Sequence, residues 1–293
     1  MIPRLPPKQL MLDSLLEERR SGLERWLKLL SQHPIISKDK MMQVFLSDGS
    51  LEQQERLRET FNSDSDEFAH LGENVVLPIE DQGRLAASRE LMRIMLNSVS
   101  KIKRLMDNQI KRADVQSKDL ADISSVLNLI TKETRDSTFS DLATGFNDIS
   151  GISENYCLRQ QRAITERFNI LLDVLIAHSD LCDRVEKGIA SEHQNMSRML
   201  QINKQKLKGV IRGTAGDNVN DLNVRQRSEV ENLGKRSAFS LSCVLEETKL
   251  AQKYLKCLPS IMLSFVNEEH QGFKQISEAW NKILITESEK LNQ

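Results

Sequence analysis

Two groups of cations are the residues of this chain best suited to chemistry, and that chemistry would be the binding of anions. The first group falls between Gln194 and Gly216, where five basic residues occur without any acidic residue. A lysine or arginine near an anionic bilayer contributes about 1 kcal/mol of attraction, which salt screens. The alternative is an ordinary solvated helix end, because cations are stabilised near a helix C-terminus anyway. The five residues are Arg198, Lys204, Lys206, Lys208 and Arg212.

The second group of cations lies about a hundred residues earlier and is interrupted only by Asp107. It could contact an anionic surface in the same way. It could equally be the polar face of a coiled coil, where acids and bases three or four residues apart form ion pairs. The residues alone leave both interpretations open. The members are Lys101, Lys103, Arg104, Lys111 and Arg112.

Side chains for catalysis or metal binding do not form a recognisable constellation. His178 falls on an apolar seam, where a buried, hydrogen-bonded histidine is the ordinary case. The carboxylate pairs Glu229 with Glu231 and Glu246 with Glu247 suit the exposed face of a helix better than acid–base chemistry. We therefore predict a protein that is not an enzyme and has no catalytic residues, no metal and no cofactor. The histidines, none of them at metal-ligand spacing, are His33, His70, His178, His193 and His270.

The composition limits the class of protein further. A formal net charge of −1 gives the 293-residue chain no general attraction for nucleic acid, so we expect no nucleic-acid partner. No apolar run of about 18 residues could span a bilayer, and the start of the chain lacks the apolar core of a signal peptide. We expect buried thiols in a reducing compartment, the cytoplasm, because Cys157, Cys182, Cys243 and Cys257 include no C-x-x-C pair.

The element that must position the first cationic group is a very long helix over residues 152–212. Its apolar side chains recur at spacings of three and four, which is typical of helices that pack side by side. A single helix of this length cannot bury its own apolar stripe, so other helices must cover it. The seam residues are Ile164, Phe168, Leu171, Leu175, Cys182, Val185, Ile189, Met196 and Met199.

Two further long helices are predicted on either side of it, over residues 81–134 and 218–289. Proline is absent between Pro78 and Pro259, and Pro259 should kink the last helix. The pattern predicts an all-α fold, an elongated antiparallel three-helix coiled coil, whose narrow core favours pairing into a dimer. The seam of the first helix is Met92, Val99, Met106, Ala113, Leu120 and Leu127, with Met95, Ile102, Ile110, Ile123 and Ile130 between them.

The first eighty residues hold five of the six prolines and have a different organisation. A helix is expected over residues 12–32, ended by His33-Pro34, and a shorter one over residues 39–46. This segment resembles the second half of a phosphoinositide-binding PX domain, in its loop Pro6-Pro7-Lys8, its helix start EERRSGL and its closing MQVFL. Followed by three long helices, it resembles the PX–BAR sorting nexins. The expected domains are residues 1–50 from a PX domain, a linker over 51–80 and a BAR domain over 81–293.

That resemblance implies a peripheral membrane adaptor on the early endosome. A homodimer would bind and curve anionic membrane and support cargo sorting and intracellular protein transport; the cargo is not indicated by the sequence. Lys8 and Arg19 would contact phosphatidylinositol 3-phosphate, which we expect this chain to bind weakly because the PX sheet with the main phosphate contacts is not in the sequence. The alternative function is a coiled-coil scaffold that holds proteins and ignores lipid.

Overall fold

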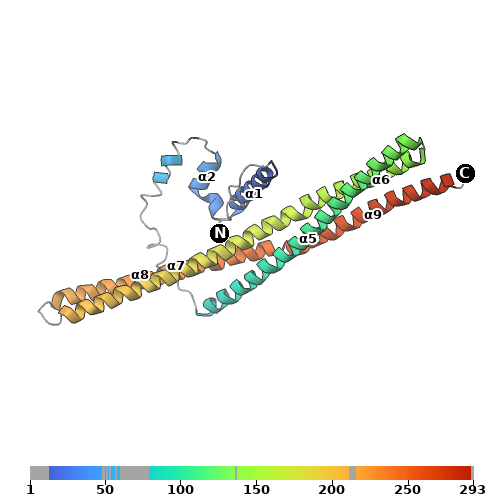
Figure 1. Ribbon diagram of the computed structural model, residues 1–293. Coiled ribbons are helices and arrows are strands. Elements are labelled where there is room, and N and C mark those ends of the chain that lie inside the picture. The colour runs from blue at the N-terminus through green and yellow to red at the C-terminus, as the bar shows by residue number, and fades with distance from the viewer. Residues whose placement is uncertain are drawn as a thin grey trace. The chain divides into compact units, whose positions relative to one another are not determined.

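All regular elements in the described part of the chain are helices, which confirms the all-α fold class (Figure 1). The computed structural model describes residues 13–47, 50, 52, 54–56, 58–59, 79–135, 137–210 and 216–291. The order of elements is α1 (Asp13–Gln32), a 3₁₀ helix (Ile36–Lys38), α2 (Lys40–Ser47), α5 (Ile79–Thr134), α6 (Ser137–Gln160), a π-helical turn (Gln161–Thr165), α7 (Glu166–Val210), α8 (Gly216–Leu255) and α9 (Leu258–Leu291).

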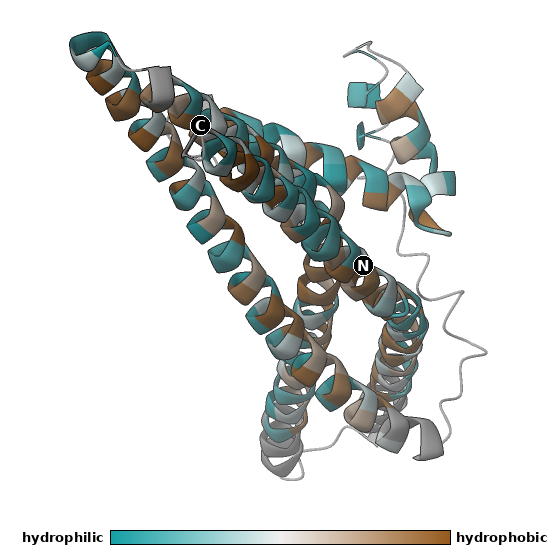
Figure 2. Ribbon diagram, turned by 90° about the vertical axis from the view of Figure 1, so that its right-hand side faces the viewer, coloured by the Kyte–Doolittle hydropathy of each residue, from teal (hydrophilic) through white to brown (hydrophobic). Residues whose placement is uncertain are grey.

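The chain divides into two compact units. The first unit is formed by Met1–Ile94 and Asp173–Gln252, and the second by Met95–Leu172 and Lys253–Gln293. Helices α5, α7 and α8 contribute residues to both units. Apolar and polar residues alternate along the long helices in bands, as Figure 2 shows, which is the pattern of helices with one buried stripe.

In the second unit, α5, α6 and α9 pack antiparallel. Ser124 donates to the carbonyl of Ala143 at 2.7 Å, and Ser117 donates to that of Ser150 at 2.9 Å, so residue numbers rise on α6 as they fall on α5. Helices α6 and α9 are also antiparallel, and between them the Phe146 and Trp280 rings meet edge to face with their centroids 5.5 Å apart. The buried side chains of this core include Val99, Met106, Ile110, Leu120, Ile149, Ile164, Phe168, Leu171 and Ile261.

In the first unit, α7 packs against both α8 and the start of α5. The Nε2 atom of His178 lies 2.8 Å from the Thr248 hydroxyl, which itself donates to the carbonyl of Val244 at 2.7 Å. Because the single hydroxyl hydrogen is used in that bond, Nε2 of His178 must carry the hydrogen that Thr248 accepts. The expectation of a buried, hydrogen-bonded His178 is confirmed. Around it the core contains Met92, Val174, Leu175, Ala177, Val244 and Ala251.

The π-helical turn changes the phase of the buried seam. Before it, one line of buried positions is 149, 153, 156 and 160, and after it that line continues at 164, 168, 171 and 175. A regular alternation of four and three from residue 149 would continue to 163 and 167, one residue too early. A π turn contains one more residue than an α turn, and this extra residue moves Ile164 and Phe168 onto the buried side.

Two predicted helices have other boundaries in the structure. The helix predicted over residues 152–212 begins earlier, because α6, the π turn and α7 form one helical path from Ser137 to Val210. The predicted kink at Pro259 is wrong. The helix instead breaks at a turn over Lys256 and Cys257, and Pro259 is the second residue of α9, where its missing N–H has no helical partner to lose.

Some seam assignments are also corrected. Ile123 and Ile130 are exposed, whereas the neighbouring side of α5 with Leu120 and Ser124 is buried. The N-terminal helices α1 and α2 agree with prediction to within a residue, and α1 ends at Gln32 before His33-Pro34. Of the four cysteines only Cys157 and Cys182 are buried, whereas Cys243 is exposed, so the expectation of four buried thiols is wrong.

Candidate functional site

Four cations form one exposed face of α5, which we call the basic face: Lys101, Arg104, Lys111 and Arg112. Eleven residues make about three turns of an α-helix, so Lys101 lies in line with Arg112. Arg104 and Lys111 are two turns apart and lie together on one side of that line. Among the residues that the structure describes, no carboxylate lies within ion-pair distance of any of the four. The face therefore presents uncompensated positive charge.

Lys103, which the sequence grouped with these four, lies elsewhere. It is turned toward the opposite side of α5, is only 20% exposed in its side chain, and pairs with Asp107 at 2.5 Å. Asp107 in turn accepts a hydrogen bond from Thr165 at 3.4 Å. Lys103 thus contributes to helix packing and is not part of the basic face.

The basic group at the end of α7 is only partly described. Lys204, Lys206 and Lys208 lie in the last turns of α7, which ends at Val210, but their side chains are outside the described part of the structure. Arg212 is outside the described residues altogether. Arg198, earlier on the same helix, is exposed.

The two candidate phosphoinositide residues are likewise only partly described. Arg19 is half-buried in the second turn of α1, whereas Lys8 lies outside the described residues. Next to Arg19, the exposed guanidinium of Arg20 bonds the Glu17 carboxylate, and this hydrogen bond raises the pKa of Arg20 and lowers that of Glu17.

A run of exposed apolar side chains continues the line of the basic face toward the C-terminal end of α5. Arg104, Val115 and Val126 follow one another at eleven-residue intervals, so they lie on the same side of the helix. A second exposed run on α9 has spacings of three, four and seven residues, which is the heptad pattern of a helix seam. The sequence analysis placed Ile123 and Ile130 in a buried seam, and it identified neither of the two exposed runs because it followed only one seam per helix. They are Val115, Ile123, Val126, Leu129 and Ile130 on α5, and Leu263, Val266, Phe273, Trp280 and Leu284 on α9.

Several polar side chains between the helices of the second unit form a network around Glu269. Its carboxylate accepts hydrogen bonds from the Tyr156 hydroxyl at 2.6 Å, from Gln160 at 2.6 Å and from Gln109 at 2.8 Å. Burial, and then the neighbouring carboxylate, raise the pKa of Tyr156 above its ordinary range. A tyrosine held protonated and a carboxylate oxygen that accepts three donors serve to fix three helices together rather than to exchange protons.

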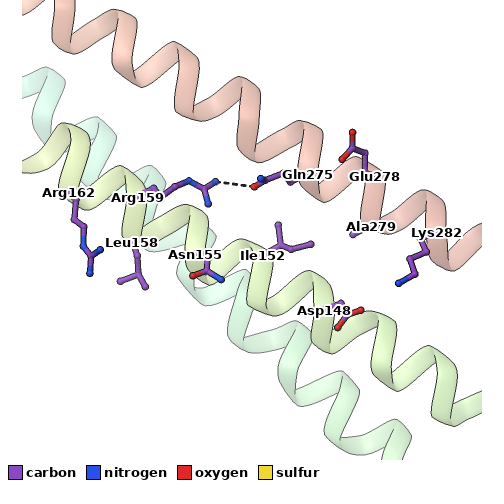
Figure 3. Close-up of a pocket in the computed structure, with 10 residues that line it drawn as sticks. All are labelled: Asp148, Ile152, Asn155, Leu158, Arg159, Arg162, Gln275, Glu278, Ala279 and Lys282. Carbon is purple, nitrogen blue, oxygen red and sulfur yellow. Dashed lines mark hydrogen bonds between the residues drawn. The ribbon is translucent and has the colours of Figure 1, made fainter.

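An open groove of about 740 Å³ runs between α6 and α9 in the same unit. Figure 3 shows its lining side chains spread along the two helices, and only Arg159 and Gln275 meet, at 3.1 Å. Arg159 also pairs with Glu268 at 3.1 Å. No acid–base pair or nucleophile converges on this groove. Within the described ranges, no three histidine, cysteine or carboxylate side chains come close enough to hold a metal ion.

One carboxylate assignment is corrected by the structure. Glu246 is exposed, as expected, but Glu247 lies 2.9 Å from Nε2 of His33 and is largely buried. This contact joins α8 to the end of α1, within the first unit. No helix in the described part of the chain is both long and apolar enough to cross a bilayer.

The sequence of this chain is similar to those of several known proteins. The family model of the PX domain matches residues 1–48. Sorting nexin-8 of Homo sapiens is 29% identical over 312 residues, which cover 97% of this chain and 66% of that protein. The chain is therefore similar to the sorting nexins over nearly its whole length. The bovine sorting nexin-8 is 28% identical over the same share of the chain, and sorting nexin MVP1 of Saccharomyces cerevisiae is 25% identical over 98% of it.

The fold of the chain also matches a solved structure. The cryo-EM structure of the SNX-BAR Mvp1 tetramer aligns with a TM-score of 0.70 and 19% identity, covering 97% of this chain and 83% of that one. The resemblance to PX–BAR sorting nexins is thereby confirmed, and so is the prediction that the protein is not an enzyme. The chain spans about two thirds of the length of the sorting nexin-8 proteins it matches.

Proposed function

We propose that the protein is a peripheral adaptor of the early endosome, which binds and curves the cytoplasmic membrane surface as a dimer and supports cargo sorting. In this proposal residues 1–50 belong to a PX domain, residues 51–80 are a linker and residues 81–293 form a BAR domain. The observation that carries it is the basic face, Lys101, Arg104, Lys111 and Arg112, in a homologue of the sorting nexins.

The physical basis of binding is many weak contacts held on one scaffold. Each cation near an anionic surface contributes about 1 kcal/mol, and contacts on a common helix act together rather than one at a time. Lys204, Lys206, Lys208 and Arg212 are proposed as a second contact region. Lys8 and Arg19 are proposed to contact a phosphoinositide headgroup, where a guanidinium can bind phosphate oxygens bidentately.

The test is charge reversal of the basic face, measured by sedimentation with vesicles that contain an anionic lipid. Lys101→Glu with Arg104→Glu and Lys111→Glu should weaken binding at least about tenfold, because three attractive contacts become repulsive. Wild-type binding should also weaken as salt rises.

A matched control reverses three cations that already pair with acids on their own helices: Lys118→Glu, Lys249→Glu and Lys274→Glu. It changes the net charge by the same amount and should retain most of the binding. Equal losses in both triple variants would leave only a net-charge effect and contradict a specific lipid-binding face.

Dimer formation is supported by the exposed apolar runs on α5 and α9. Single apolar side chains scattered over a surface need no partner. A continuous line of them at heptad spacing favours packing against a second helix. The similar SNX-BAR structure is described as a tetramer, so assembly beyond a dimer is part of the proposal.

A coiled-coil scaffold without lipid binding is the second candidate function, because the same apolar runs would hold protein partners. The vesicle experiment separates the two. A scaffold would fail to sediment with vesicles of any diameter or charge.

A further inference from the structure

Two polar pairs join α1 to the coiled coil within the first unit, and both are shielded from water. Nε of Arg25 lies 3.1 Å from a carboxylate oxygen of Asp173 on α7, with side chains 17% and 34% exposed. Nε2 of His33 lies 2.9 Å from Glu247 on α8, with side chains 5% and 13% exposed. By contrast, Arg20 and Glu17 pair within α1 at more than 60% exposure, where ion pairs contribute little.

The hydrogen bonds of His33 identify its tautomer. Its Nδ1 atom accepts the backbone N–H groups of Ile35, at 3.2 Å, and of Ile36, at 3.1 Å, so Nδ1 carries no hydrogen. The hydrogen is therefore on Nε2, which donates it to the carboxylate of Glu247. One rigid ring thus closes the turn after α1 with one nitrogen and holds α8 with the other.

The position of His33 follows from the periodicity of α1. Arg25, Leu29 and His33 are four residues apart, so they lie on one side of the helix, and Leu29 and the adjacent Leu30 are both buried. A buried charge-assisted hydrogen bond is stronger than a neutral one, and leaving one of its partners alone is costly. The histidine that ends α1 is therefore also its most buried polar contact with the coiled coil.

We propose that His33 is a positioning residue, which fixes α1 on the coiled coil through Glu247. Arg25 and Asp173 add a second, more exposed point of attachment two turns earlier. The docking itself does not depend on lipid. The role of this docking in membrane binding rests on the proposed function. Because α1 carries Arg19, a fixed α1 would bring the phosphoinositide contact and the coiled coil to a membrane together.

The docking is tested by hydrogen exchange of the α1 amides in the full chain. Glu247→Ala should lower the protection of residues 16–32 about tenfold or more, because the imidazole N–H loses its acceptor. Glu247→Gln keeps an oxygen that accepts from Nε2 and should restore most of the protection. The matched control is Glu246→Ala, at the neighbouring exposed position, which should leave α1 unchanged.

Substitutions of His33 separate its two nitrogens without altering the coiled coil. Asparagine places an acceptor near Nδ1 but does not reach Glu247, whereas glutamine places a donor near Nε2. His33→Asn should therefore expose α1 as Glu247→Ala does, and His33→Gln should retain part of the protection. In a double-mutant cycle, Glu247→Ala should cost α1 little further protection once His33 is alanine. Should Glu247→Ala fail to fold, His33→Asn removes the same bond from outside the long helices.

Three results would overturn the positioning role. Protection of α1 could be the same in Glu247→Ala as in the wild type, or exchange could rise equally in α1 and α8, or the losses from His33 and Glu247 could add fully. A separate arm uses vesicles with phosphatidylinositol 3-phosphate. Loss of α1 protection with unchanged vesicle binding would contradict the lipid part of the proposed function and leave the docking by His33 standing.

Discussion

At the scale of single residues, His178 links stability to pH. Burial lowers its pKa below the ordinary 6.5, although Glu247 acts in the opposite direction. The unfolded chain therefore binds a proton more readily than the folded one, so stability rises with pH in this range. The contribution of His178 is complete above pH 6.5 and is lost as the pH falls from 6.5 toward its lowered pKa.

We therefore expect the thermal unfolding midpoint to fall as the pH is lowered from 7.5 to 5. His178→Gln, which can still donate to Thr248, should show a smaller fall over the same interval. Thermal unfolding followed by circular dichroism across this range makes the comparison. Parallel curves for the two proteins would contradict the assignment of His178 as a buried neutral imidazole.

Gly272 is needed for the close approach of Tyr156 to α9. A Cβ at position 272 would overlap the Tyr156 ring, with three ring carbons at 3.0 Å or less. Gly272→Ala should lower the free energy of unfolding by about 1–3 kcal/mol, as overpacking does. The control is Gly151→Ala on α6, where no atom lies within 4 Å, and alanine should stabilise the helix by about 0.5–1 kcal/mol. Urea unfolding measures both, and a neutral Gly272→Ala would show that the ring can move aside.

Residue types alone predicted some of these environments. His178 could be placed in the core because it falls on the heptad seam of α7, and burial confirms it. The partnership of Glu247 with His33 could not be predicted, because it depends on where α1 docks, more than two hundred residues away in the chain. The separation of Lys103 from the basic face could not be predicted for a related reason, since charge grouping in sequence ignores which side of the helix each residue occupies.

At the scale of helices, α5 and α6 approach closely through small polar side chains. Ser117 and Ser150 donate to each other's backbone carbonyls at 2.9 and 2.8 Å. Ser117→Leu should force the helices apart and lower the free energy of unfolding by about 1–3 kcal/mol. Ser125→Leu, on the exposed side of α5, should change it by less than about 0.5 kcal/mol, and urea unfolding of both variants tests the contrast. Similar losses in the two would contradict the close packing.

The existence and order of the helices could be predicted from heptad spacing and the absence of proline. The π turn could not be assigned from one apolar seam, although two successive spacings of four, from Gln160 to Ile164 to Phe168, were a signal for it. The break at Lys256 and Cys257 was missed because a proline two residues later was interpreted as a kink, when it is in fact tolerated at a helix start.

At the scale of the whole molecule, the exposed apolar run on α5 should determine the oligomeric state. Val126→Asp with Leu129→Asp places two charges in the proposed interface and should convert a micromolar dimer to monomer, because buried unpaired charges are costly. Met199→Asp with Leu200→Asp changes two other exposed apolar residues, on α7, and should leave the dimer intact. Sedimentation velocity reports the masses. A dimer that survives the α5 changes would place the interface elsewhere.

The all-α fold class could thus be predicted from the sequence. The resemblance to sorting nexins could be predicted too, from the N-terminal motif and the long helices. The division into a basic face and an apolar run on one side of α5 was not. That division depends on which of the several seams of α5 the other helices cover, and Ile123 shows the difficulty, since it continues the heptads yet is exposed.

The π turn at Gln161–Thr165 has a practical meaning for anyone who edits this protein. A heptad numbering that starts on α6 is shifted by one residue on α7. Segments grafted from other coiled coils must therefore be joined with that one-residue offset. Deleting one residue of the turn would let Ile164 and Phe168 continue the regular alternation of four and three on the buried side. If the helix instead kept every residue and became regular, both side chains would rotate by about 100° away from the core. The apparent irregularity is what keeps the two stretches in step.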